Sequence, residues 1–71
     1  MKAKNYRVEL FNDYAPIKGM LSDFAKHTSV VNARNWAIER GKKGEASYVR
    51  LYEKSENRYN HYVFVAEISL I

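Results

Sequence analysis

The residue types that carry catalysis or bind metals are few and scattered in this sequence. The chain has no cysteine, and its two histidines, His27 and His61, lack the neighbouring ligands at the spacing of a metal site. Ser22 and Asp23 lie close to His27, but no nucleophile-elbow pattern surrounds the serine. We therefore expect a protein that is not an enzyme and that uses no metal, cofactor or small-molecule substrate.

A second chemically suggestive stretch is basic, with Arg40, Lys42 and Lys43 as its positive patch. Residues 41–44, Gly-Lys-Lys-Gly, resemble the Gly-X-X-Gly loop of KH domains, which clamps a nucleic-acid backbone. In that family the loop joins two helices, whereas a predicted strand follows here. The stretch also lacks the Gly-x-x-x-x-Gly-Lys-Ser/Thr pattern of a P-loop. We interpret it as the end of a helix with solvated lysines.

Length and composition predict one compact domain spanning residues 1–71. Hydrophobic residues make up 46% of the chain, which is normal for a folded domain. Twelve Lys and Arg against eight Asp and Glu give a net charge of +4, a mild bias toward anionic partners. The first residues lack the apolar segment of a signal peptide, and the apolar run at residues 62–66 is too short to span a bilayer. We therefore expect a cytoplasmic protein with no membrane partner.

The strongest structural signal is a helix over residues 28–44. A hydroxyl of Thr28 or Ser29 can cap its start, and Gly41 or Gly44 can end it in the left-handed conformation. Apolar residues recur along it at helical spacing: Val30, Val31, Ala33, Trp36, Ala37 and Ile38. We expect this stripe to pack on a sheet, with Trp36 as the anchor of the core.

Alternating apolar and polar residues predict strands over residues 5–11, 47–54 and 59–71. Residues 17–25 fit either a strand or a second helix. We favour the strand, because Gly19 would fall in the middle of that helix. The expected fold is α+β, a four-stranded antiparallel sheet with one helix on one face in the order ββαββ. The alternative order, with residues 17–25 helical, is βααββ.

A single helix covers only one side of such a sheet. The helix side is expected to carry an apolar set: Tyr6, Val8, Leu10, Val49, Leu51, Phe64, Ala66 and Ile68. The opposite side is expected to carry a mixed aromatic, basic and apolar set: Arg7, Glu9, Phe11, Tyr48, Arg50, Tyr52, His61, Val63 and Val65. Residues 62–66 are apolar in both phases, as in a strand buried on both sides. An uncovered apolar surface of this kind marks an interaction site.

Two functions fit that uncovered side. In the first, it binds a protein, either a second copy of the chain or a different target, through aromatic and arginine anchors. In the second, it binds single-stranded nucleic acid, with tyrosines stacking on bases and basic residues meeting phosphates. We favour the first, and the predicted binding residues are Arg7, Phe11, Tyr48, Arg50, Tyr52, His61, Val63 and Val65. Helix-on-sheet chains of this size resemble small accessory proteins of phages and other mobile elements, many of which bind and modulate a host protein.

Overall fold

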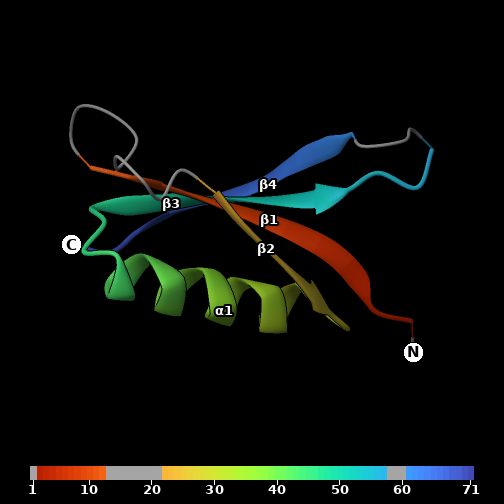
Figure 1. Cartoon of the computed structure of the whole chain (residues 1–71), viewed down its shortest axis with the longest axis horizontal. Helices are drawn as coiled ribbons and strands as arrows, with labels where there is room; N and C mark the ends of the chain where they lie inside the picture. The colour runs from red at the N-terminus through yellow and green to blue at the C-terminus, as the bar shows by residue number, and fades with distance from the viewer. Residues whose placement is uncertain (1, 13–21, 58–60) are drawn as a thin grey trace.

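The computed structural model describes residues 2–12, 22–57 and 61–71 of the chain. These residues form a four-stranded antiparallel sheet and a helix (Figure 1). In chain order the elements are β1 (Lys4–Phe11), β2 (Ser22–His27), α1 (Val30–Lys43), β3 (Tyr48–Lys54) and β4 (Tyr62–Ser69). The predicted α+β fold and its order, ββαββ, are confirmed.

The segment that fitted both a strand and a helix is a strand where it is described. Ser22–His27 forms β2 and pairs antiparallel with β1, from Lys4 opposite His27 to Glu9 opposite Ser22. The helical alternative is therefore wrong for residues 22–25, and residues 17–21 lie outside the described part of the chain. His27 is the last residue of this strand.

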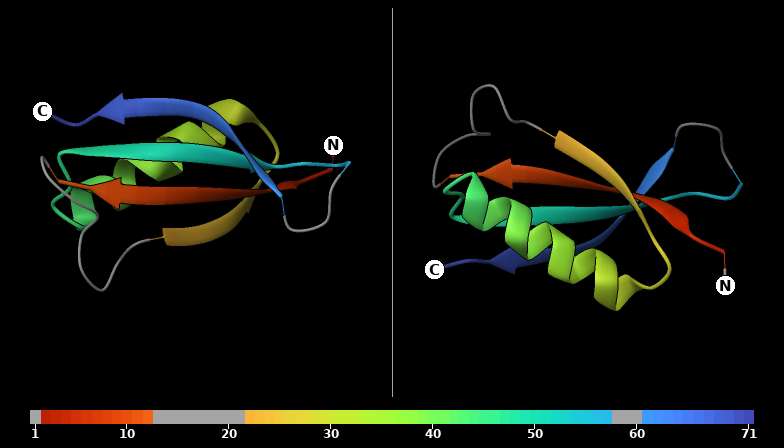
Figure 2. Two further views of the ribbon diagram at one scale, coloured as in Figure 1. Left: turned by 90° about the horizontal axis from the view of Figure 1, so that it is seen from above. Right: turned by 60° about the horizontal axis from the view of Figure 1, so that its bottom comes forward.

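The sheet has the strand order β2-β1-β3-β4, so β1 and β3 are central and β2 and β4 form the edges. Both views of Figure 2 show α1 lying diagonally across one face of the sheet. The connection from β2 to β3 therefore passes over this face and places the helix against three strands, β1, β2 and β3. In the described residues no helix is both long and apolar enough to cross a membrane.

The core lies between α1 and the sheet. Among the described residues it consists of Tyr6, Val8, Leu10, Ala33, Ala37, Val49, Leu51 and Ile68. The strand members occupy alternate positions, because successive side chains of a strand point to opposite faces. Burying each of the larger side chains contributes about 1.5–3 kcal/mol to folding. The predicted helix side of the sheet is confirmed for these strand residues.

Trp36 does not anchor this core, contrary to the prediction. The buried stripe of α1 is made of small residues, Ala33, Ala37 and Gly41, which let the helix backbone lie close to the sheet. So close a contact leaves no room for an indole between the two layers. Trp36 instead packs half-buried at the margin of the core, with its ring centroid 5.2 Å from that of His27.

Both ends of α1 are capped, each in a different way. The Ser29 hydroxyl accepts a hydrogen bond from the Asn32 amide (3.1 Å), which confirms the predicted start. At the other end the amide of Ala46 donates to the carbonyl of Gly41 (2.9 Å) and the amide of Glu45 to that of Lys42 (3.1 Å), the bonding pattern of a Schellman motif. The left-handed residue of this motif is Glu45 (φ 58°), not one of the two glycines proposed from the sequence.

A β-bulge in β4 changes the faces predicted for three of its residues. Leu51 of β3 pairs with Ala66, but the next residue, Tyr52, pairs with Phe64, so Val65 is inserted between them. Phe64 therefore lies on the face away from the helix, where Tyr52 lies, and its assignment to the helix side is wrong. Val65 and Val63 move the other way, because Val65 packs against the core and Val63 pairs with Glu53, which alternates with Tyr52.

We expect Glu45→Gly to stabilise the protein. A side chain costs about 1–2 kcal/mol in the left-handed conformation, and glycine does not pay this cost, although its looser unfolded chain offsets a part. The free energy of unfolding in urea should rise by about 1 kcal/mol. Glu45→Ala is the control for loss of the carboxylate and should leave stability almost unchanged. A gain of equal size in both variants would mean that charge, not backbone conformation, is responsible.

Gly41→Ala should destabilise the protein, although alanine is the better helix former by about 1 kcal/mol. A Cβ atom at this position would lie 2.6 Å from Val49 Cγ1 and would overlap Leu70 Cδ1. Overpacking at such a site costs typically 1–3 kcal/mol, which exceeds the gain in helix propensity. Asn35→Ala, at an exposed position of the same helix, is the matched control and should be slightly stabilising. Urea denaturation that finds Gly41→Ala at least as stable as the parent would contradict this packing.

Candidate functional site

The candidate site is the face of the sheet that α1 does not cover, which we call the open face. Strand register aligns its side chains in rows that cross the sheet. The first row, from β2 to β4, contains Phe24, Arg7, Tyr52 and Phe64. The second row contains Ser22, Glu9, Arg50 and Glu67, and the third contains Phe11, Tyr48 and Ser69. The first and third rows are therefore mainly aromatic, and the second is mainly charged.

Arg7 connects the first two rows. Its guanidinium carbon lies 5.4 Å from the centroid of the Tyr52 ring, a cation–π distance, and its Nη2 donates to Glu9 Oε2 at 2.9 Å. Nη2 is also 3.4 Å from the Ser22 hydroxyl. The Tyr52 ring in turn meets the Phe64 ring edge-on, with centroids 5.9 Å apart. The arginine is thus fixed in place and already has a carboxylate partner.

Arg50 repeats this arrangement at the other end of the open face. Its Nε donates to Glu67 Oε1 at 3.0 Å, and its guanidinium carbon lies 4.9 Å from the Phe11 ring centroid. The Phe11 and Tyr48 rings are parallel and stacked, with centroids 5.0 Å apart. The hydrogen bond to Glu67 raises the pKa of Arg50, so its positive charge is held beside that carboxylate. Each of these two arginines is therefore paired with a glutamate of the same face. Lys26 and Lys54 also lie on this face by their register.

Only part of the aromatic surface remains accessible. Most side chains of the open face are half-buried by one another, whereas Phe24 and Phe64 are 57% and 54% exposed. Phe24 also meets Tyr62 edge-on, with ring centroids 5.6 Å apart, although these residues lie on opposite edge strands. The two edges of the sheet therefore bend toward each other on the open face. Phe24 and Phe64 are its two most accessible phenylalanines.

The structure brings together five of the eight predicted binding residues: Arg7, Phe11, Tyr48, Arg50 and Tyr52. Val63 and Val65 are not among them because of the bulge in β4. His61 precedes β4, and its carbonyl oxygen accepts a hydrogen bond from the Ser55 amide (2.7 Å).

Sequence reasoning missed Phe24 and Phe64 on this surface. If residues 22–27 are taken as a strand, the alternation of its side chains places Phe24 on the open face. No pattern in the sequence announces the bulge that turns Phe64 over.

The predicted basic patch lies elsewhere and is partly neutralised. Arg40 Nε donates to Asp23 Oδ2 at 2.7 Å, so this arginine pairs with β2. Lys42 and Lys43 are exposed in the last turn of α1, where their charge suits the negative end of the helix dipole. A shallow hollow of about 650 Å³ lies beside them and is lined by Trp36, Glu39, Arg40, Lys42 and Lys43. The patch belongs to the helix and does not continue into the open face.

His27 lies among aromatic rings, and His61 precedes β4. The ring of His27 lies between those of Tyr6 and Trp36, with centroids 6.1 Å and 5.2 Å away, and its Nε2 is buried without a hydrogen-bond partner. Among the described residues no three His, Asp or Glu side chains are placed to share a metal ion. His27 therefore serves as an aromatic packing residue at the helix start.

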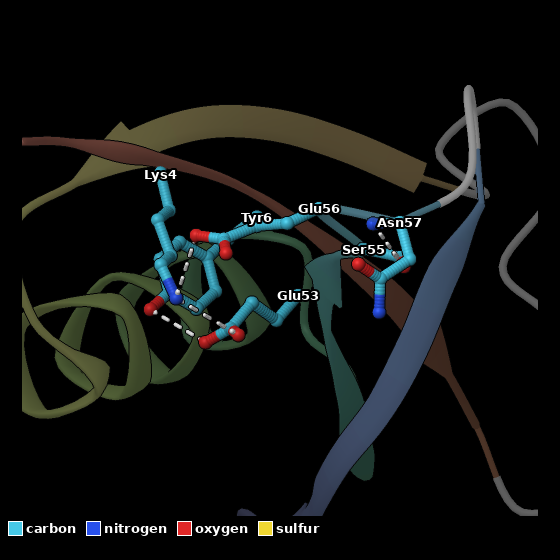
Figure 3. A network of polar contacts seen from close by, with 6 residues as sticks. All are labelled: Lys4, Tyr6, Glu53, Ser55, Glu56 and Asn57. Atoms are coloured by element: carbon cyan, nitrogen blue, oxygen red, sulfur yellow. Dashed lines mark hydrogen bonds and ion pairs between the residues drawn. The ribbon is translucent and has the colours of Figure 1, made fainter.

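A polar cluster joins β1 to the end of β3 (Figure 3). The hydroxyl of Tyr6, whose ring is in the core, donates to Glu53 Oε2 at 3.0 Å. Lys4 lies 3.6 Å from the other Glu53 oxygen and 3.5 Å from Glu56. The Ser55 hydroxyl accepts from the Asn57 amide (3.2 Å) and begins the turn toward β4. This cluster gives the buried phenol a hydrogen-bond acceptor at the sheet margin, which a buried hydroxyl requires.

We expect Tyr6 to make stability depend on alkaline pH. Burial, and then the hydrogen bond to Glu53, raises the pKa of Tyr6 above the ordinary value of 10.0. The stabilisation from the neutral phenol is therefore complete below about pH 10 and is lost as the pH rises through the raised pKa. In Tyr6→Phe, unfolding free energy measured in urea should fall less steeply above about pH 10 than in the parent.

Burial also raises the pKa of Tyr52, so Tyr6→Phe should keep part of the alkaline slope. The double variant Tyr6→Phe/Tyr52→Phe should be flatter than either single variant. At neutral pH the loss of the hydrogen bond to Glu53 should cost Tyr6→Phe about 1–2 kcal/mol. An alkaline slope that is identical in Tyr6→Phe and the parent would contradict the buried position of this phenol.

These contacts hold the side chains of the open face in defined positions. The arginines are paired, the rings are packed edge-on or face-on, and the accessible groups are apolar. Comparison of the chain with family models, with curated proteins and with solved structures gives no match.

Proposed function

We propose that this chain is a non-enzymatic protein-binding module and that the open face is its contact surface. The observation that carries the proposal is the pairing of each arginine on that face with both a carboxylate and an aromatic ring. Such a surface is aromatic and internally ordered. Aromatic residues and arginine are enriched at the energetic centres of protein interfaces.

The accessible phenylalanines suit the role of anchors. Phe24 and Phe64 stand at opposite edges of the open face and expose more than half of their surface. Covering an exposed phenylalanine with a partner removes apolar area from water at about 25 cal/mol per Å². The side chains between them already hold defined positions, so a partner would order few of them on binding. This lowers the entropic cost of association.

The charges favour a protein over single-stranded nucleic acid. A phosphate chain would have to displace Glu9 from Arg7 and Glu67 from Arg50, and it would then face both freed carboxylates. Nucleic-acid grooves instead offer unpaired cations along the backbone and free ring faces for stacking. Here the guanidinium of Arg50 lies against the Phe11 ring, and Tyr48 is stacked on that ring. Nucleic acid is therefore the alternative that the experiment must separate.

Site-specific photocrosslinking tests the proposal. Benzoylphenylalanine in place of Phe24 keeps an aromatic side chain on the open face, whereas the same residue in place of Asn35 lies on the exposed side of α1. In extracts of the producing cells, the probe at position 24 should label a defined protein species and the probe at position 35 should not. The label should weaken at least about fivefold when Tyr48→Ala or Arg50→Ala is added, in line with loss of an anchor.

Three results would contradict a protein partner at this surface. The first is equal labelling from positions 24 and 35. The second is a labelled species that nuclease removes. The third is binding of single-stranded DNA or RNA that falls steeply with salt and depends on Arg50, since such a slope reports neutralised phosphates.

A further inference from the structure

β4 has the composition of a central strand but the position of an edge strand. Residues 62–66 are apolar in both phases, a pattern found where a strand is covered on both faces, as the central strands of a sheet are. Among the described strands, however, β4 has one neighbour, β3. We propose that two copies of this chain pair antiparallel through β4 and so form one continuous sheet. The proposal goes beyond the proposed function, because the paired surface is the edge of β4 and not the open face.

The two edges of the sheet differ in the features that protect an edge from pairing. β2 is short, carries three ionisable side chains (Asp23, Lys26 and His27) and contacts the helix. β4 is longer and carries one charged residue, Glu67, whose carboxylate is already bound to Arg50. Natural proteins blunt free edges with charges, especially lysine, and with short strands. By these criteria β2 is protected and β4 is not.

The bulge in β4 fixes one register for the pairing. Val65 and Ala66 both pack on the core side, so the strand changes phase between them. Centring the two-fold axis there places Val65 of one copy opposite Ala66 of the other and keeps all further pairs on matching faces. These pairs are Phe64 with Glu67, Val63 with Ile68, and Tyr62 with Ser69. The two Glu67 side chains are then not opposite each other, so the pairing brings no like charges together.

The start of α1 supplies cover for the added strand. Both views of Figure 2 show the first turn of the helix on the β4 side of the sheet. That turn begins with Val30 and Val31, which are 45% and 67% exposed. Val63, on the same side of the sheet by its register, is 49% exposed. A strand paired with β4 would extend the sheet and cover the exposed side chains of Val30, Val31 and Val63. The strand that pairs there should be apolar on both faces. β4 itself has such a sequence, so a second copy of β4 suits this position.

Mass measurement with a matched pair of variants tests the dimer. Sedimentation of the full chain from about 1 to 200 μM should show the mass rising from 8.3 kDa toward twice that value. Phe64→Lys puts a charge on the β4 edge and should raise the dissociation constant at least about tenfold. Phe24→Lys changes the same residue type at a similar exposure on β2 and should alter it less than about twofold. A chain that stays monomeric throughout, or equal effects of the two variants, would overturn the proposal.

The absence of cysteine allows a test of the register. In Tyr62→Cys/Ser69→Cys, the two thiols lie about 20 Å apart within one chain, which forbids an internal disulfide. In the proposed dimer each thiol lies directly opposite the other type in the second copy. A thiol oxidant should then convert the double variant, and neither single variant, into a covalent dimer. Absence of this cross-link, or cross-linking of the single variants alike, would overturn the pairing even where a dimer forms.

These outcomes separate the two proposals. Val63→Lys, which changes a β4 side chain on the helix side of the sheet, leaves the anchors of the open face in place. Loss of the dimer in this variant with undiminished photolabelling from position 24 supports pairing through β4 and a separate partner on the open face. A dimer that Phe24→Lys disrupts would instead place the second copy on the open face and overturn pairing through β4. Circular dichroism of each variant confirms that the sheet and helix are intact before masses are compared.

Discussion

In the part of the chain that the structure describes, one helix has to cover a sheet that has two faces, and the other contacts depend on this limit. α1 covers one face over β1, β2 and β3, and it does so at short range because its buried stripe is Ala33, Ala37 and Gly41. The side chains between the layers are therefore those of the sheet, led by Tyr6, Leu10 and Leu51. A chain of this length buries only about 60% of its unfolded surface, so each of these contacts is a large part of its stability.

On the open face, the side chains shield one another from water. Its aromatic rings are shielded from water by each other and by the flat guanidinium groups of two arginines, which keep their charge satisfied by neighbouring carboxylates. An arginine can do this because its planar head stacks on a ring while its edge still donates hydrogen bonds. The same arrangement holds the rings in fixed positions. The contacts that shield the rings from water therefore also order them.

Much of this fold is visible in the amino-acid sequence, because its signals are local. Alternation fixed the core residues of β1 and β3, and the hydroxyl of Ser29 marked the start of α1. The features that could not be predicted depend on the meeting of distant segments. Phe64 changed face because the register of β4 on β3 slips at Val65, and Trp36 was displaced because a helix of small residues packs too closely for it.

The candidate site follows the same division. Arg7, Tyr48 and Tyr52 were placed on the open face by strand periodicity alone. Their partners could not be foreseen, because an ion pair such as Arg50 with Glu67 joins strands whose register is a tertiary property. The left-handed conformation of Glu45 was also not predicted. Two nearby glycines can adopt that conformation with less strain, yet neither of them is the left-handed residue.

The contact between Phe24 and Tyr62 has a geometric consequence for recognition. Rings from opposite edge strands can touch only if the sheet bends toward the open face. Since the two rings are in contact, they bridge the open face at that end, and a binding partner would have to fit the curvature of the rows beyond them. Selectivity at this surface would then come from curvature before any individual residue is read.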